Sequence, residues 1–382
     1  MLFKKLIRTF FKYKAQFISM IIMVILGIAI FAGFNAEWYS IDKDTSAFFD
    51  ETNFATYRIY NDKKPFSLED LDKIKKIDGV SKATRYISID VSETRENDII
   101  KLTVSENFTV SSFALQDGKE YDPNDENGIW LSKNYASRNN YKIGDVIELK
   151  YGNIVRQLTI RGICLSGEYL INTHNDALMP DFDKVGYAYT TPAFYEKLST
   201  DIFGSVYYPQ INVISSSNKE EFSTNVDKAL NTTLQVIPLD DVVSYSQAKG
   251  ESDEGKTMGS VLPVIFLLIA ILTMVTTMNR ITSNEKVQIG ILKALGFKNK
   301  RILWHYTSYA FTIGAIGGVI GLILGFAISK IFFSPTGSMG TYFEMPDWSI
   351  HMPYFVYIGI ILIVAFLTLI GYLSVKRQLR GS

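Results

Sequence analysis

The chain has 382 residues, of which 47% are apolar, and it carries 39 basic and 39 acidic side chains. This balanced bulk charge gives no indication of a nucleic acid partner, and the single cysteine, Cys164, excludes an intrachain disulfide and a cysteine-rich zinc site. The charges are segregated, because residues 35–258 hold 24 basic and 36 acidic side chains, whereas the rest of the chain holds 15 basic and only 3 acidic ones. Such segregation is typical of a membrane protein with basic cytoplasmic loops and an acidic domain across the bilayer.

Four stretches are apolar and long enough, at roughly 20 residues, to cross the hydrocarbon core. Basic residues flank them on one side only, which predicts that both termini are cytoplasmic. In chain order we predict a cytoplasmic N-terminus at 1–14, transmembrane helices at 15–36, 257–279, 302–333 and 350–375, an extracytoplasmic domain and stalk at 37–256, a cytoplasmic loop at 280–301, a short extracytoplasmic loop at 334–349, and a cytoplasmic tail at 376–382.

The first apolar stretch has an alternative interpretation as a secretory signal peptide, because it follows a basic segment. Its apolar run is longer than the roughly 7–15 residues of a signal peptide, and Phe34-Asn35-Ala36 is a poor cleavage site. We therefore favour a retained anchor.

The centres of the four spans carry no charged residue, which argues against a proton-coupled carrier or pump. The third span has Gly317, Gly321 and Gly325 at intervals of four, a small-residue face that lets another helix approach closely. Two partners for this face remain open: the second or fourth span of the same chain, or a second chain.

The segment between the first two spans predicts a domain whose two ends have similar patterns, a strand, a helix and a strand. A capping box at Ser217 and Glu220 is expected to open the second of these helices. The first unit comprises strand 57–60, a helix from Leu68 to Ile77 and strand 87–91; the second comprises strand 211–214, a helix from Phe222 to Leu230 and strand 234–237.

Between these two units lies an insert that is mainly strands, at 129–131, 146–149 and 158–163. After it, a strand at 188–190 and a helix-like segment at 192–198 lead back toward the second unit. We therefore expect a membrane protein with four transmembrane helices and a two-lobed extracytoplasmic α+β domain inserted between helices 1 and 2.

Residues 250–257 fit the phosphate-loop pattern G-x-x-x-x-G-K-[ST], but we reject a nucleotide site there. Such a loop follows a buried strand, whereas this segment precedes a transmembrane span and carries three carboxylates that would repel a triphosphate. The three histidines, His174, His305 and His351, are far apart in sequence, so a metal site is not expected, and no catalytic motif is present.

The cytoplasmic loop predicts a short amphipathic helix that ends at Gly296. Glu285 is placed at the positive end of its dipole and Lys293 in its last turn, while Ile289, Leu292 and Leu295 share one face. Two roles are open: a helix that lies among lipid headgroups, or a docking helix for a cytoplasmic partner.

The run Asn284-Glu285-Lys286-Val287-Gln288-Ile289-Gly290-Ile291-Leu292-Lys293-Ala294-Leu295-Gly296 resembles the E-x-x-x-I-G-I-L-K-A-L-G stretch of FtsX-like permeases, the membrane subunits of MacB-type ABC transporters. Asp78-Gly79-Val80, the segment Ile129 to Ser132 and the segment Ile143 to Ile147 are similar to the periplasmic core of that family. The chain departs from the family early in the third span, where Tyr306-Thr307-Ser308-Tyr309 has no acidic residue, and in its short tail.

The resemblance implies a permease subunit of a bacterial cell membrane that is not itself an enzyme, with ATP and Mg²⁺ bound by separate cytoplasmic ATPase subunits. It implies that ATP-driven movement reaches the extracytoplasmic domain, for efflux, lipoprotein or peptide handling, or activation of an outside partner protein. Other implied partners are membrane lipids and a second permease copy or a homologous half. The chain is then either a half-size permease or part of a longer one. The implied coupling helix comprises Glu285, Ile289, Gly290, Leu292, Lys293, Leu295 and Gly296. The alternative is a membrane-anchored sensor or scaffold without an ATPase.

Overall fold

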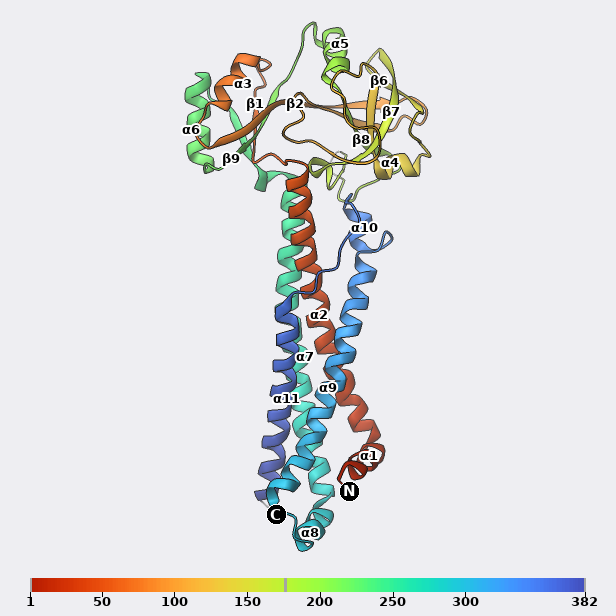
Figure 1. Cartoon of the computed structure of the whole chain (residues 1–382), viewed down its shortest axis with the longest axis vertical. Coiled ribbons are helices and arrows are strands. Elements are labelled where there is room, and N and C mark those ends of the chain that lie inside the picture. The colour runs from red at the N-terminus through yellow and green to blue at the C-terminus, as the bar shows by residue number, and fades with distance from the viewer. Residues whose placement is uncertain (1, 175–176, 381–382) are drawn as a thin grey trace. The chain divides into compact units, whose positions relative to one another are not determined.

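The computed structural model describes residues 2–174 and 177–380 and divides into two compact units (Figure 1). The helical bundle comprises the chain up to residue 41, residues 251–334 and the chain from residue 349 on. The α/β domain comprises residues 42–250 and 335–348.

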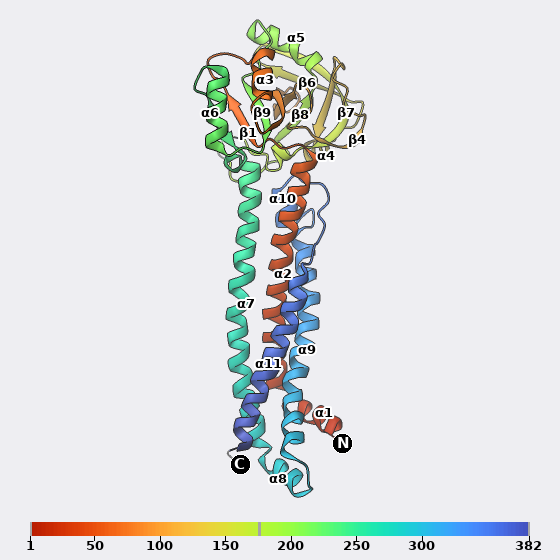
Figure 2. The ribbon, with the colours of Figure 1, turned by 60° about the vertical axis from the view of Figure 1, so that its left-hand side comes forward.

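Within the described residues, four helices are long and apolar enough to cross a membrane. They are α2 (Lys14–Glu51), α7 (Val243–Asn284), α9 (Asn299–Phe332) and α11 (Tyr354–Arg380). Two shorter helices, α1 (Leu2–Lys12) and α8 (Lys286–Ala294), lie with the end of α11 at one end of the bundle (Figures 1 and 2).

The helices differ in extent from the predicted spans. Helix α2 continues to Glu51 and α7 begins at Val243, so both cross the boundary between the two units without interruption. Residues 350–353 are not helical, and α11 continues into the predicted tail as far as Arg380. Met1, at the start of the predicted N-terminus, and Gly381 and Ser382, at the end of the predicted tail, lie outside the described residues.

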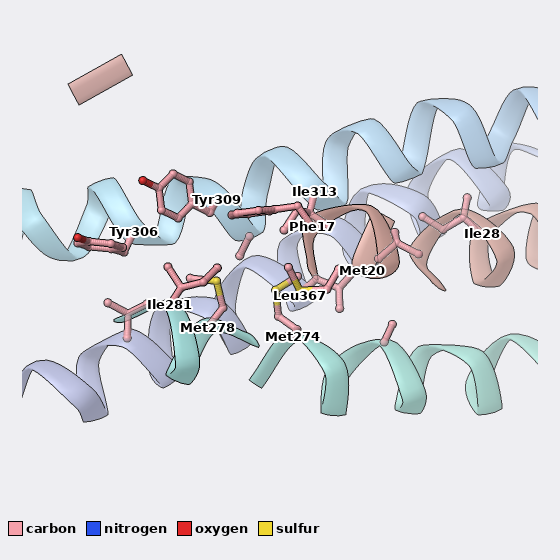
Figure 3. Packing of buried hydrophobic residues seen from close by; sticks show 14 of the residues in the cluster. Phe17, Met20, Ile28, Met274, Met278, Ile281, Tyr306, Tyr309, Ile313 and Leu367 are labelled. Carbon is pink, nitrogen blue, oxygen red and sulfur yellow. The ribbon is translucent and has the colours of Figure 1, made fainter. Parts of the chain in front are cut away.

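The bundle core is formed by apolar side chains from all four long helices (Figure 3). Helix α2 presents a continuous buried face, which fits a span that is part of the bundle. The buried side chains that Figure 3 labels are Phe17, Met20 and Ile28 of α2, Met274, Met278 and Ile281 of α7, Tyr306, Tyr309 and Ile313 of α9, and Leu367 of α11.

The glycine face of α9 packs against α2, the first span. A Cβ atom added at Gly317 would lie 2.5 Å from Val24 Cγ1, one at Gly321 would lie 2.8 Å from Ile28 Cβ, and one at Gly325 would lie 2.7 Å from Ala32 Cβ. The partners predicted for this face, the second or fourth span or a second chain, were therefore wrong, because the first span fills it. The spacing identifies a close contact but not which helix makes it.

The first lobe of the α/β domain has the predicted pair of strand–helix–strand units. Strand β1 lies between β9 and β10 and is antiparallel to both. Helix α6 is capped by the side chain of Asn218, which accepts a hydrogen bond from the Glu221 amide, so the predicted capping box of Ser217 and Glu220 was wrong by one residue. The elements are β1 (Tyr57–Tyr60), α3 (Leu68–Lys75), β2 (Val80–Glu93), β9 (Gln210–Ser215), α6 (Lys219–Leu230) and β10 (Gln235–Pro238).

The second lobe is the strand-rich insert, and it contains two strands and a short helix that were not predicted from the sequence, β3, β4 and α4. The 14-residue strand β2 joins the lobes, because its first half pairs with β9 and its second half pairs with β3. The elements are β3 (Ile99–Ser105), β4 (Ala114–Gly118), β5 (Gly128–Ser132), α4 (Lys133–Arg138), β6 (Val146–Tyr151), β7 (Ile154–Leu165), β8 (Val185–Thr190) and α5 (Pro192–Phe203), with short 3₁₀ turns at Gly167–Tyr169 and Leu239–Asp241.

The loop between α9 and α11 packs into the α/β domain. It contains the short helix α10 (Ser338–Tyr342), and after this helix Glu344 is buried. The Glu344 amide donates to the Leu170 carbonyl at 2.8 Å, and the Asn134 amide donates to Glu344 Oε1 at 2.9 Å. The segment is therefore more than a connection between two spans.

Candidate functional site

The candidate site is built around α8, the short helix between α7 and α9. The helix ends where Gly296 adopts a left-handed conformation with φ of +87°. The Gly296 amide donates to the Lys293 carbonyl, and the Phe297 amide donates to the Leu292 carbonyl, both at 3.0 Å. These are the two bonds of a Schellman motif, which glycine favours because it has no Cβ atom.

Glu285 lies between α7 and α8 and fixes the start of α8. Its side chain is 1% exposed, and its Oε1 atom lies 3.3 Å from Lys12 Nζ, while the Tyr306 hydroxyl donates to Oε2 at 3.3 Å. Hydrogen bonds to Tyr13 and to Glu285 raise the pKa of Lys12. The carboxylate therefore connects α1, α8 and α9, and it makes no side-chain cap of α8.

Ile289 and Leu292 face the bundle. They are 2% and 8% exposed and belong to its core. Ile289, Leu292 and Leu295 were expected to form one apolar face for docking. Only Leu295 is exposed, so these three residues do not form an accessible face. With apolar residues on both sides of a nine-residue helix, periodicity does not show which side is covered.

The exposed side of α8 carries a second apolar row, made of Val287, Ile291 and Leu295. Their exposed fractions are 76%, 55% and 65%, and their spacing of four residues places them on one face. Gly290 lies beside this row with open space around it, since a Cβ atom added there would meet nothing within 4 Å. Lys293 is half-buried. We call Val287, Ile291 and Leu295 the exposed row.

A groove of about 590 Å³ follows the exposed row at the turn into α9. Its lining combines basic residues, Lys298, Lys300 and Arg301, with the indole of Trp304, which is 55% exposed. No salt bridge joins these three basic residues to an acidic side chain in the described part of the chain. The site thus joins an apolar surface to a basic one.

The segment that fits the phosphate-loop pattern, residues 250–257, lies inside helix α7. A phosphate loop needs consecutive backbone amides free to bind phosphate, and those of a continuous helix are used within it. Among the described residues, no group of three His, Cys, Asp or Glu side chains is arranged to hold a metal ion.

The fold and the site define a class of protein: a multi-pass membrane protein with an α/β domain between its first two spans and a short helix between its second and third. The family model for the FtsX-like permease C-terminal region matches residues 260–382, and that for the MacB-like periplasmic core domain matches residues 17–229. The chain belongs to the FtsX/MacB type of ABC transporter permeases.

A curated relative from Methanocaldococcus jannaschii, described as an uncharacterized ABC transporter permease, is 25% identical over 254 residues, or 62% of this chain. The aligned region spans 57% of that relative's length. Two solved structures are also similar, each with a TM-score of 0.34. The extracellular domain of the noncanonic ABC-type transporter YknZ from Gram-positive bacteria is 16% identical, covering 48% of this chain and 99% of that one. The periplasmic region of MacB from Actinobacillus actinomycetemcomitans is 12% identical, covering 55% of this chain and 94% of that one.

The sequence pattern predicts α8 and its end at Gly296, but the exposed row and the basic groove were not predicted from it. A signal for the exposed row was present, since Val287, Ile291 and Leu295 repeat every four residues. For the groove the signal was the cluster of Lys298, Lys300 and Arg301 beside Trp304.

Proposed function

We propose that this chain is the permease subunit of an ABC transporter and that α8 is the element on which a cytoplasmic ATPase subunit docks. The observation that carries the proposal is the exposed row on a helix whose opposite face is held in the bundle core. Apolar anchors at intervals of four residues are the pattern by which a helix binds in a groove of a partner. The basic groove beside the row would take acidic side chains of the same partner.

The proposed mechanism uses the rigid attachment of α8. Ile289 and Leu292 pack in the bundle, and Glu285 bonds to α1 and α9, so a force on the exposed row would move the bundle helices with α8. Helices α2 and α7 continue without a break into the residues of the α/β domain. ATP-driven movement of the ATPase would pass along them to that domain.

The test is co-purification of the full chain with its ATPase subunit and measurement of ATP turnover. Val287→Ala combined with Ile291→Ala should release the ATPase, since truncation of a central apolar anchor costs about 2 kcal/mol or more, roughly a 30-fold loss of affinity. Ile289→Ala should instead lower the thermal stability of the chain, because this side chain is in the core.

The matched control is Gln288→Ala, an exposed polar residue of the same helix, which should leave ATPase recovery unchanged. Equal recovery by the double variant and the wild type would contradict the docking role and favour a helix that lies in the headgroup region. If no nucleotide-hydrolysing subunit co-purifies with the wild-type chain, that result would favour the alternative hypothesis of a membrane-anchored sensor or scaffold.

A further inference from the structure

The α/β domain contains an open pocket of about 390 Å³ that the proposed ATPase docking does not use. Side chains from β1, β2, β3, β9 and β10, from the 3₁₀ turn after β7 and from the segment before α7 line it. Its volume lies at the lower end of the range of small-molecule sites, about 300–1,000 Å³. The size suits a small ligand rather than a folded partner.

The floor of the pocket is a set of polar groups that satisfy one another. Arg58 Nη2 donates to both carboxylate oxygens of Glu168, at 2.7 and 2.8 Å, and both side chains are less than a tenth exposed. The Tyr169 hydroxyl lies 2.7 Å from Ser88 Oγ and 2.6 Å from Thr103 Oγ1. These contacts make the floor rigid, and the arginine–glutamate pair adds no net charge.

Lys101 is different, because its ammonium group is only partly satisfied. An ammonium has three donors, and the structure gives Lys101 Nζ one hydrogen bond, to the Thr173 carbonyl at 2.7 Å. No carboxylate lies within 4.0 Å of it in the described residues, since its cross-strand neighbour Asp90 lies against His174, at 3.6 Å. Burial lowers the pKa of Lys101, against a smaller opposing effect of the Asp90 carboxylate.

Two further groups line the same pocket. The Tyr60 hydroxyl makes no hydrogen bond to any described residue, and its ring and that of Tyr86 help to line the pocket. Asp241 is also part of the lining, and its ionic contact is a long one, 3.7 Å to the exposed Lys219. The pocket therefore offers a cation, a hydroxyl donor and two carboxylates, those of Asp90 on the neighbouring strand and of Asp241.

The charge of the whole domain limits the ligand further. Residues 42–250 and 335–348 together hold 23 basic and 34 acidic side chains, a net charge of −11. Such a field repels polyanions and disfavours phosphate esters, but it does not repel a molecule that carries one positive and one negative group.

We propose that this pocket binds a small zwitterion, an amino acid or dipeptide, whose carboxylate is held by Lys101 and Tyr60 and whose ammonium group faces Asp241. Charge-assisted hydrogen bonds at both ends supply the affinity, and the tyrosine rings contact the rest of the ligand. The inference goes beyond the proposed ATPase docking and does not depend on it.

The test is calorimetric titration of the full chain in detergent with the dipeptide glycyl-tyrosine. We expect binding in the millimolar range or tighter, and at least about tenfold weaker binding of glycyl-tyrosine amide and of N-acetylglycyl-tyrosine, because each lacks one charge. Lys101→Gln should weaken binding of the dipeptide about tenfold. It should also remove the preference for glycyl-tyrosine over its amide. The control Lys142→Gln, at an exposed lysine that is not part of the pocket, should bind like the wild type.

Tyr60→Phe keeps the ring and removes the hydroxyl, so it tests the site even if Lys101→Gln does not fold; weaker binding of the dipeptide is expected. Equal affinity of the wild type for acid and amide would overturn the proposal, as would unchanged binding by a folded Lys101→Gln variant. Binding of inorganic phosphate without binding of the dipeptide would show a simple anion site instead, and would also overturn it.

Discussion

At the scale of single residues, Glu344 is the carboxyl group with the most unusual setting in the α/β domain. It comes from the loop between α9 and α11, it is 2% exposed, and the Asn134 amide donates to it. Burial raises the pKa of Glu344 to about 8, against the smaller opposing effects of the Asn134 amide and of Lys133. Near neutral pH the folded domain therefore holds a proton that the unfolded chain releases.

This protonation predicts a pH dependence of stability. Between the ordinary pKa of a glutamate, about 4.5, and about 8, the folded state binds more protons than the unfolded state, so stability falls as pH rises through this window. The slope from this group approaches about 1.4 kcal/mol per pH unit. Glu344→Gln should flatten the dependence, as thermal unfolding of the purified chain at a series of pH values would measure. An unchanged slope would contradict the buried, protonated carboxyl, and the exposed Glu120→Gln serves as the control.

At the scale of elements, the contact between α2 and α9 depends on the absence of side chains. Gly321 of α9 has no room for a Cβ atom, which would lie 2.8 Å from Ile28 Cβ and 3.1 Å from the Ile25 carbonyl oxygen. Gly321→Leu should therefore destabilise the bundle by about 1–3 kcal/mol or more. The measurement is thermal unfolding of the purified chain in detergent. Wild type and variant are compared only if both insert into the membrane to the same level before purification.

The same substitution at Gly290 is the matched control. Gly290 is also helical, but nothing lies within 4 Å of an added Cβ atom, so Gly290→Leu should cost no stability. If both variants unfold at the wild-type temperature, the close packing of α9 on α2 is wrong.

Sequence patterns predicted most elements but not their partners. The glycine repeat of α9 defines a contact face, yet the helix that fills it is set by tertiary packing. On α8, local spacing grouped Leu295 with Ile289 and Leu292, and the bundle covers only the latter two. At the start of α6, Ser217 and Asn218 are both good N-cap residues, and the local sequence does not show which of the two caps the helix.

The pocket of the α/β domain had no sequence signal at all. Lys101 comes from β3, Tyr60 from β1 and Asp241 from the turn before α7, and none of them belongs to a motif. Only the strand pairing brings such distant positions together, so a site of this kind becomes visible only in the structure.

At the scale of the whole molecule, the orientation in the membrane is testable. The end of α11, α1 and α8 lie at one end of the bundle (Figures 1 and 2). Most basic residues outside residues 35–258 lie in these segments or directly beside them in the sequence. The positive-inside rule then predicts that this end is cytoplasmic. Single cysteines at the exposed positions Ser46 and Asn140 should react with an impermeant maleimide in intact cells, and one at Asn299 should react only after permeabilisation.

The labelling is done in a Cys164→Ala background, although Cys164 is fully buried. Labelling of a cysteine at Asn299 in intact cells would contradict the predicted orientation. It would also contradict the proposed docking of a cytoplasmic ATPase on α8.

The position of β1 between β9 and β10 also has a consequence for biosynthesis. Residues 57–60 leave the ribosome early, but their sheet neighbours, residues 210–215 and 235–238, are made only about 150 and about 180 residues later. Synthesis proceeds at roughly 5–20 residues per second. Both edges of β1 therefore stay without their native partners until synthesis has nearly reached the start of α7 at Val243. During that interval of roughly 8–36 seconds the unpaired edges of β1 can pair with a wrong strand, and a chaperone on that side of the membrane would act in this window.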